Sequence, residues 1–266
     1  MLSVWQCIFI IAGTVVLSLV FLGVLRRIWP ASRRTEHNDV IGWQISVLGT
    51  TYAVILAFML WNVWNNFQTA RINAEMEANF LVDLYRITGG LEPAQGKPIR
   101  ALCREYAAVA VNEEWPAMAQ EKLSTHSFSI TQQMWEVLLQ AHSDTGGGPS
   151  SRGQEDIFQQ SKYEQAFSTL SQMSEHRRLR QLESRMKLPG ILWAVLVVGG
   201  IVVIGSACLF GCQNFRLHFV LVFVLSLLLS LVLVSVAEID RPFQGPVHVR
   251  ADAFEFAQQT FAQLPQ

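Results

Sequence analysis

The stretch VLGTTYAVILAFMLWNVWNNF, residues 47–67, decides the fold because it is mostly apolar and contains neither proline nor a charged residue. A helix rises about 1.5 Å per residue, so about 20 apolar residues cross a bilayer core of about 30 Å. The apolar segment covers residues 43–64, and apolar residues continue at helical spacing until a Gly-Gly pair at residues 89–90. We therefore predict one long helix that crosses a membrane and continues into the aqueous phase.

Three further apolar segments have the length of a membrane span: residues 4–25, 190–212 and 217–237. The first has no preceding positive charge and no cleavage site of small residues, so we interpret it as a retained span and not as a signal peptide. The composition agrees, because 51% of the 266 residues are hydrophobic and only 15% are charged. The net charge of −1 gives no reason to expect nucleic acid as a partner.

The chain divides into four regions. The first two spans lie within residues 1–64, and a polar insert with helical patterns covers residues 65–189. The last two spans lie within residues 190–237, and residues 238–266 form a joint followed by an amphipathic helix. Within the insert, glycine and serine predict a flexible linker at residues 143–153. We predict an all-α membrane protein with four transmembrane helices and a helical soluble domain inserted between the second and third.

The motifs that could carry catalysis do not combine into a site. The six histidines lack metal-binding spacings such as H-x-x-x-H, and the four cysteines predict free thiols. In NEEWP, residues 112–116, adjacent carboxylates point about 100° apart on a helix. We interpret Glu113 and Glu114 as a solvated helix end, and we predict no enzymatic activity, cofactor or metal.

The second span carries a narrow stripe of small or weakly polar residues on a helical wheel. Its members are Ser46, Gly49, Thr50, Ala53 and Ala57. Two interpretations stay open. Either the small side chains allow a neighbouring helix to pack closely, or copies of the stripe surround a pore in an oligomer, where hydroxyl groups face water.

Basic residues bear on orientation, since loops rich in lysine and arginine favour the cytoplasmic side. Near the span ends, eight basic residues lie on the side of the insert and five on the other side, which predicts a cytoplasmic insert and cytoplasmic termini. A basic cluster precedes the third span: Arg177, Arg178, Arg180, Arg185 and Lys187. The cluster either anchors the chain at lipid headgroups or raises the local concentration of anions.

After the fourth span, AEIDRPFQGPVH at residues 237–248 predicts a helix end and a joint between the membrane and soluble layers. The joint residues are Glu238, Asp240, Arg241, Pro242, Phe243 and Gly245. The acids lie where the span meets water, with the arginine close enough to pair with either. The proline ends the helix, the phenylalanine anchors the turn, and the glycine redirects the chain so that the last helix can lie along the soluble helices.

Several of these motifs resemble one family. Residues 47–67 are similar to the second transmembrane segment of bestrophins, and DRPFQG at residues 240–245 resembles their Pro-Phe-Gly element after the fourth segment. Glu-Trp-Pro at residues 114–116 and Leu-Pro-x-x-x-Trp at residues 188–193 complete a pattern similar to a mostly bacterial family called bestrophin-like. The resemblance covers nearly the whole chain.

The resemblance implies a homo-oligomer, most simply a pentamer, in the bacterial inner membrane. It would conduct ions passively, with anions favoured by the family, through a pore lined by the second span. The implied partners are the lipid bilayer, further copies of the chain and inorganic anions. The alternative function is a non-conducting scaffold or sensor whose soluble domain binds a partner.

Two departures from bestrophins matter. The aromatic positions of the bestrophin neck fall on Ser46 and Thr50, so a hydrophobic gate of that kind is not expected. Where bestrophins carry a dense acidic calcium site, only Glu238, Asp240 and Asp252 are present. Calcium gating is therefore not predicted.

Overall fold

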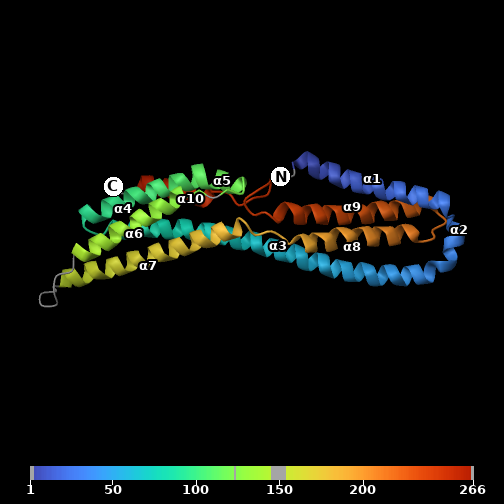
Figure 1. The fold of residues 1–266 in the computed structure, drawn as a ribbon, viewed down its shortest axis with the longest axis horizontal. Coiled ribbons are helices and arrows are strands. Elements are labelled where there is room, and N and C mark those ends of the chain that lie inside the picture. The colour runs from blue at the N-terminus through green and yellow to red at the C-terminus, as the bar shows by residue number, and fades with distance from the viewer. Residues whose placement is uncertain (1–2, 123, 145–153, 265–266) are drawn as a thin grey trace. The chain divides into compact units, whose positions relative to one another are not determined.

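The computed structural model describes residues 3–122, 124–144 and 154–264, and within these ranges the regular structure is helical, with no strand (Figure 1). The predicted all-α fold is confirmed. The chain forms two compact units. The apolar unit comprises Met1–Phe67, Lys187–Arg241 and Gly245–Val247, and the polar unit comprises Gln68–Met186, Pro242–Gln244 and His248–Gln266.

The long helix predicted from residues 47–67 is present as α3, which runs from Asn38 to Thr88 without interruption. It ends directly before Gly89 and Gly90, because paired glycines do not support helix continuation. The first part of α3 belongs to the apolar unit and the part from Gln68 onward belongs to the polar unit. The extent of this helix therefore follows from local sequence alone.

The apolar unit contains α1 (Val4–Ile28), the first part of α3, α8 (Gly190–Leu209) and α9 (Phe215–Ile239), which lie side by side in Figure 1. The short helix α2 (Ala31–Arg34) and the 3-10 turn η1 (Thr35–His37) connect α1 to α3. In the described part of the chain, four helices are long and apolar enough to cross a membrane, and each contains most of one predicted apolar segment.

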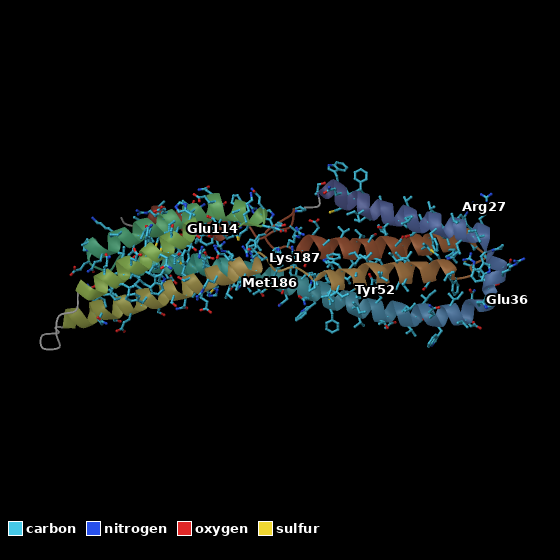
Figure 2. The ribbon with its side chains drawn as sticks, in the orientation of Figure 1. Arg27, Glu36, Tyr52, Glu114, Met186 and Lys187 are labelled. Carbon is cyan, nitrogen blue, oxygen red and sulfur yellow. The ribbon has the colours of Figure 1, made fainter. Side chains whose placement is uncertain are left out.

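The helices of the apolar unit pack through a small set of close contacts. Tyr52 of α3 is buried, and its hydroxyl donates a hydrogen bond of 2.7 Å to the carbonyl of Leu196 on α8 (Figure 2). Gly199 allows this approach, because a Cβ there would lie 2.6 Å from the Tyr52 ring. Helix α1 packs mainly against α9, with Leu22 and Val222 buried between the two helices.

The polar unit consists of the second part of α3 and a set of shorter helices (Figure 1). These are α4 (Pro93–Val109), the π-helical turn η2 (Ala110–Glu114), α5 (Trp115–Ala119), α6 (His126–Asp144), α7 (Gln154–Glu183) and α10 (Asp252–Gln263). Pro116 does not end the helical path, since it lies in the first turn of α5, where its missing N–H is not needed. Most of the predicted linker, residues 145–153, lies outside the described residues.

Candidate functional site

The small-residue stripe of α3 lies on a surface that the other helices of the apolar unit leave uncovered. Its members Ser46, Thr50, Ala53 and Ala57 are exposed, and Gly49 is half-buried. The neighbouring face of α3, with Tyr52, Leu56 and Val63, is instead buried in the core formed with α8 and α9. No charge lies on the stripe, and the Ser46 hydroxyl donates to the Gly42 carbonyl at 2.9 Å. The stripe is therefore a narrow, uncharged surface free of bulky side chains.

A third face of α3 is also exposed, and it is large and apolar. Trp43, Val54, Phe58 and Trp61 are all exposed there. Successive residues of a helix are about 100° apart around its axis. The bulky apolar face therefore borders one side of the small-residue stripe, and the buried face with Tyr52 borders the other side. The first part of α3 thus presents a face buried in its own bundle, then the small stripe, then a bulky apolar face.

The structure separates the five residues of the basic cluster into two kinds. Arg178, Arg185 and Lys187 are exposed, whereas Arg177 and Arg180 are buried. Arg177 and Arg180 lie on the same buried face of α7 as Leu170 and Met173. Only the exposed residues can act on ions in solution.

Arg180 is at the centre of a buried ionic network in the polar unit. Its side chain has 0% exposure, and its Nε and Nη2 lie 2.6 and 2.9 Å from the carboxylate oxygens of Glu77 on α3. Nη2 also lies 2.5 Å from Oε2 of Glu114, which is marked in Figure 2. Tyr106 donates its hydroxyl to Glu77 at 2.5 Å, and the guanidinium lies over the ring of Trp115 at 4.8 Å. One arginine thus joins α3, α7 and η2.

The second buried arginine extends this network to α6. Arg177 donates from Nε and Nη2 to the Ser127 hydroxyl at 3.0 and 2.8 Å, and Ser127 in turn donates to Glu114. The prediction of a solvated helix end at residues 112–116 is wrong for Glu114, which is 2% exposed. The 100° offset does place Glu113 outside, but it turns Glu114 towards two arginines that lie more than 60 residues away in sequence.

The charges in this network reinforce one another. Burial acts to raise the pKa of Glu114, but Arg180, Ser127 and Arg177 together hold that pKa below its usual value. Burial acts to lower the pKa of Arg180, and the two carboxylates Glu77 and Glu114 outweigh it. For Tyr106, burial and the nearby carboxylates both raise the pKa, so its phenol stays protonated and can donate to Glu77. Glu114 and Arg180 are therefore both ionised at neutral pH, and Tyr106 is a neutral donor beside them.

A second polar contact joins α3 and α7 next to this network. Asn73 donates to Oε1 of Glu183 at 2.7 Å, and its carbonyl oxygen lies 2.8 Å from Nδ1 of His176, whose ring stacks on Phe80. Oε2 of Glu183 is buried without a hydrogen-bond partner in the described part of the chain. Burial raises the pKa of Glu183, and the Asn73 hydrogen bond offsets only part of that rise.

The sequence interpretation did not single out Glu77, Asn73, Ser127 or Glu183. A signal for Glu77 was present, because it lies among the buried alanines and leucines of α3, at positions such as Ala74 and Leu81. A charged residue on an apolar helix stripe is expected to have a partner when buried. The identity of that partner, however, is set by tertiary packing.

The predicted joint residues Glu238, Asp240 and Arg241 belong to the apolar unit. Asp240 accepts from the backbone N–H of Leu188 at 2.8 Å and from the indole of Trp193 at 3.4 Å. Glu238 accepts from the Cys7 thiol at 3.2 Å, and Arg241 is exposed. The carboxylate of Asp240 thus ties the start of α8 to the end of α9.

The joint residues Pro242 and Phe243 belong to the polar unit. Phe243 is buried edge-on against Trp115 at 5.9 Å, and the Trp115 indole donates to the Val249 carbonyl at 2.9 Å. Gly245 has a φ of +82°, a conformation that favours glycine. The Glu-Trp-Pro and Pro-Phe-Gly motifs, far apart in sequence, therefore contact each other through these two aromatic rings.

The amphipathic helix expected within residues 238–266 begins at Asp252 and ends at Gln263. It packs against α4, with Phe254 edge-on to Trp115 and Phe261 stacked on Tyr85 at 4.5 Å. This amphipathic helix therefore lies along the helices of the polar unit.

The apolar helices, together with the helical polar unit, define the class: an integral, all-helical membrane protein. The sequence profile of the Bestrophin-like domain matches residues 12–254. The chain therefore belongs to the Bestrophin-like family. The resemblance found in the short motifs is confirmed.

Solved structures agree with this assignment at the level of the fold. Crystal structures of two single-substitution variants of a bacterial bestrophin homologue from Klebsiella pneumoniae have TM-scores of 0.59 and 0.65 at 14% and 15% identity. The matches cover 95% and 97% of this chain and 98% of each homologue. A crystal structure of a membrane protein variant has a TM-score of 0.70 at 11% identity, covering 95% of this chain and 97% of that one. No curated protein matches the sequence.

Proposed function

We propose that the protein is a homo-oligomeric channel, most simply a pentamer, that conducts inorganic anions passively through a pore lined by α3. The observation that carries this proposal is the uncovered small stripe of α3, from Ser46 to Ala57, beside a face that is tightly buried around Tyr52. A helix surface without bulky side chains leaves room for an ion path when several copies face one axis. The family assignment supports a channel.

The bulky apolar face of α3 supports assembly. Trp43, Phe58 and Trp61 are exposed on a single chain and adjoin the stripe. In a closed ring, each copy contacts its neighbour through two different surfaces. The bulky face would then pack on the next copy while the stripe faces the axis, so that one helix serves both the interface and the pore.

Charge near the pore would come from three residues of the basic cluster. Arg178, Arg185 and Lys187 are exposed, whereas Arg177 and Arg180 are neutralised by buried carboxylates. Exposed positive charges raise the local anion concentration by a field that salt screens. We place the polar unit and both termini in the cytoplasm of a bacterial inner membrane, following the basic-residue count.

The test is ion flux through liposomes that contain the purified protein. Thr50→Trp introduces a large ring on the stripe of every copy, and chloride flux should fall about tenfold or more because the ring narrows the path. Val16→Trp is the matched control, since Val16 is exposed on α1 and lies off the proposed pore. Its flux should equal that of the unmodified protein.

Two results would contradict the proposal. An oligomer that passes no ion across several salts and potentials would favour the scaffold or sensor function. Equal flux with Thr50→Trp and Val16→Trp would exclude α3 as the lining helix. Native mass spectrometry of the detergent-solubilised protein tests the assembly, and a monomer would rule out a pore built from one helix per copy.

A further inference from the structure

Arg34, in the short helix α2, is buried, and no carboxylate of the described residues forms an ion pair with it. Its side chain has 0% exposure, and Nη1 donates to the carbonyl of Cys208 on α8 at 2.7 Å. The other donors, Nε and Nη2, are buried without a hydrogen-bond partner in the ranges that the structure describes. A guanidinium does not lose its proton in proteins. Arg34 therefore carries a full positive charge with two unused donor nitrogens.

A second unused polar atom lies in the same part of the apolar unit. His218 of α9 is 2% exposed, and its Nε2 lies 3.0 Å from the carbonyl of Ala207. Its Nδ1 is buried without a partner among the described residues. Because Arg34 and His218 bond to the carbonyls of consecutive residues, Ala207 and Cys208, both side chains reach the same turn of α8.

The surrounding charge is positive. Arg26 donates from Nη2 to the Gln213 carbonyl at 2.8 Å, and its charge acts on both Arg34 and His218. The acidic residues nearest in sequence, Glu36 and Asp39, are exposed and do not pair with Arg34. An uncompensated buried charge strongly destabilises a folded protein. A bound anion would therefore stabilise Arg34 beyond the partial negative charge that the C-terminal carbonyls of α8 provide.

We propose that Arg34 and His218 bind a small inorganic anion of chloride size between α2, α8 and α9. The Nε–H and Nη2–H groups of one guanidinium edge converge on a single acceptor, which is the geometry that binds anions well. Because Nε2 already donates to a carbonyl, Nδ1 of His218 is a third donor only in the imidazolium form, which the negative charge of the bound anion favours.

The enclosure favours a free ion over a lipid phosphate. Neither Arg34 nor His218 has appreciable exposed surface, and a headgroup tethered to a glycerol would need an open mouth. Asn38 closes one side, because its side chain exchanges two hydrogen bonds with Gly211, of 2.8 and 3.0 Å. The four-residue helix α2 is the short element whose displacement would admit the ion. This site involves none of the α3 stripe, so it does not depend on the proposed pore.

Anomalous scattering from crystals of the full chain grown in bromide tests the site directly. We expect a bromide peak within hydrogen-bond distance of Nε and Nη2 of Arg34. Because crystallisation uses the unmodified protein, the result does not depend on whether a variant folds. A bromide structure with no peak at Arg34 would overturn the proposal.

Thermal unfolding in detergent provides the solution test. Replacing gluconate with chloride at constant ionic strength should raise the apparent unfolding temperature, because an ion that binds only the folded state stabilises it. Arg34→Met should lose this chloride response, and Arg33→Met, at an exposed neighbour, should keep it. An equal response in both variants would refute the site. If phosphatidylglycerol micelles in gluconate reproduce the shift, the ligand is a lipid phosphate and the inorganic-anion proposal fails.

Discussion

Replacing Arg180 with methionine should destabilise the polar unit more than any exposed substitution on α7. Arg180 has 0% exposure and makes two contacts with Glu77 and one with Glu114. Its removal leaves two carboxylates buried with too little positive charge. Breaking a buried pair in this way costs about 3–5 kcal/mol, a large share of a typical total stability of about 5–15 kcal/mol.

The assay is thermal unfolding of the purified full chain, followed by circular dichroism. At about 2–4 °C per kcal/mol for a protein near this size, Arg180→Met should lower the apparent unfolding temperature by about 6–20 °C. Arg178→Met is the matched control, because Arg178 is exposed on the same helix. Exposed substitutions usually change stability by about 0.5 kcal/mol or less.

A charge-compensated variant isolates the physical cause. Combining Arg180→Met with Glu77→Gln removes the carboxylate left without a partner, while Glu114 keeps Arg177 and Ser127, so much of the lost stability should return. If Arg180→Met and Arg178→Met shift the unfolding temperature equally, the ionic network is not what stabilises this unit. If the double variant is no more stable than Arg180→Met alone, lost packing and not stranded charge explains the effect.

Two further predictions concern the polar unit. Burial raises the folded-state pKa of Glu183, so its ionised carboxylate destabilises the fold at neutral pH. Glu183→Gln should therefore raise the apparent unfolding temperature at about pH 7 and by much less at about pH 4, where the carboxyl is mostly protonated in both states. The exposed Glu175→Gln should show no such pH difference. Gly96→Ala would place a Cβ 2.1 Å from the Thr88 carbonyl oxygen, so it should destabilise by more than about 1 kcal/mol. Gly190→Ala, in open space, should be neutral or stabilising by up to about 1 kcal/mol, and a loss of stability there equal to that of Gly96→Ala would argue against the clash.

The extent of α3 could be predicted from the sequence because its causes are local. Residues 47–67 carry no breaker, apolar residues continue at helical spacing, and Gly89 and Gly90 end the helix. Hydropathy over about 20 residues likewise predicts the apolar helices. The motifs around Trp115 and Phe243, together with residues 47–67 and 188–193, indicated the Bestrophin-like family, which the profile match confirms. Each of these features depends on neighbours along the chain or on short patterns.

The direction and partners of charged side chains were decided by tertiary structure. Arg177 and Arg180 belong to the same basic stretch as Arg178, yet the first two are buried and the third is exposed. Their partners Glu77 and Glu114 lie 103 and 66 residues from Arg180 in sequence. The sequence could place Arg180 on a helix face, but only the packing of α3, α6 and η2 against α7 determines whether that face meets acids or water.

Arg34 shows the same separation between local and tertiary information. In the sequence it is one of four arginines in a short loop, where exposure is the ordinary expectation. In the folded protein its side chain is instead buried and donates to the carbonyl of Cys208, 174 residues away. The sequence by itself determined the helices, the apolar segments and the family. Tertiary structure decided which charges are buried, because burial depends on side chains that meet only after distant helices have packed.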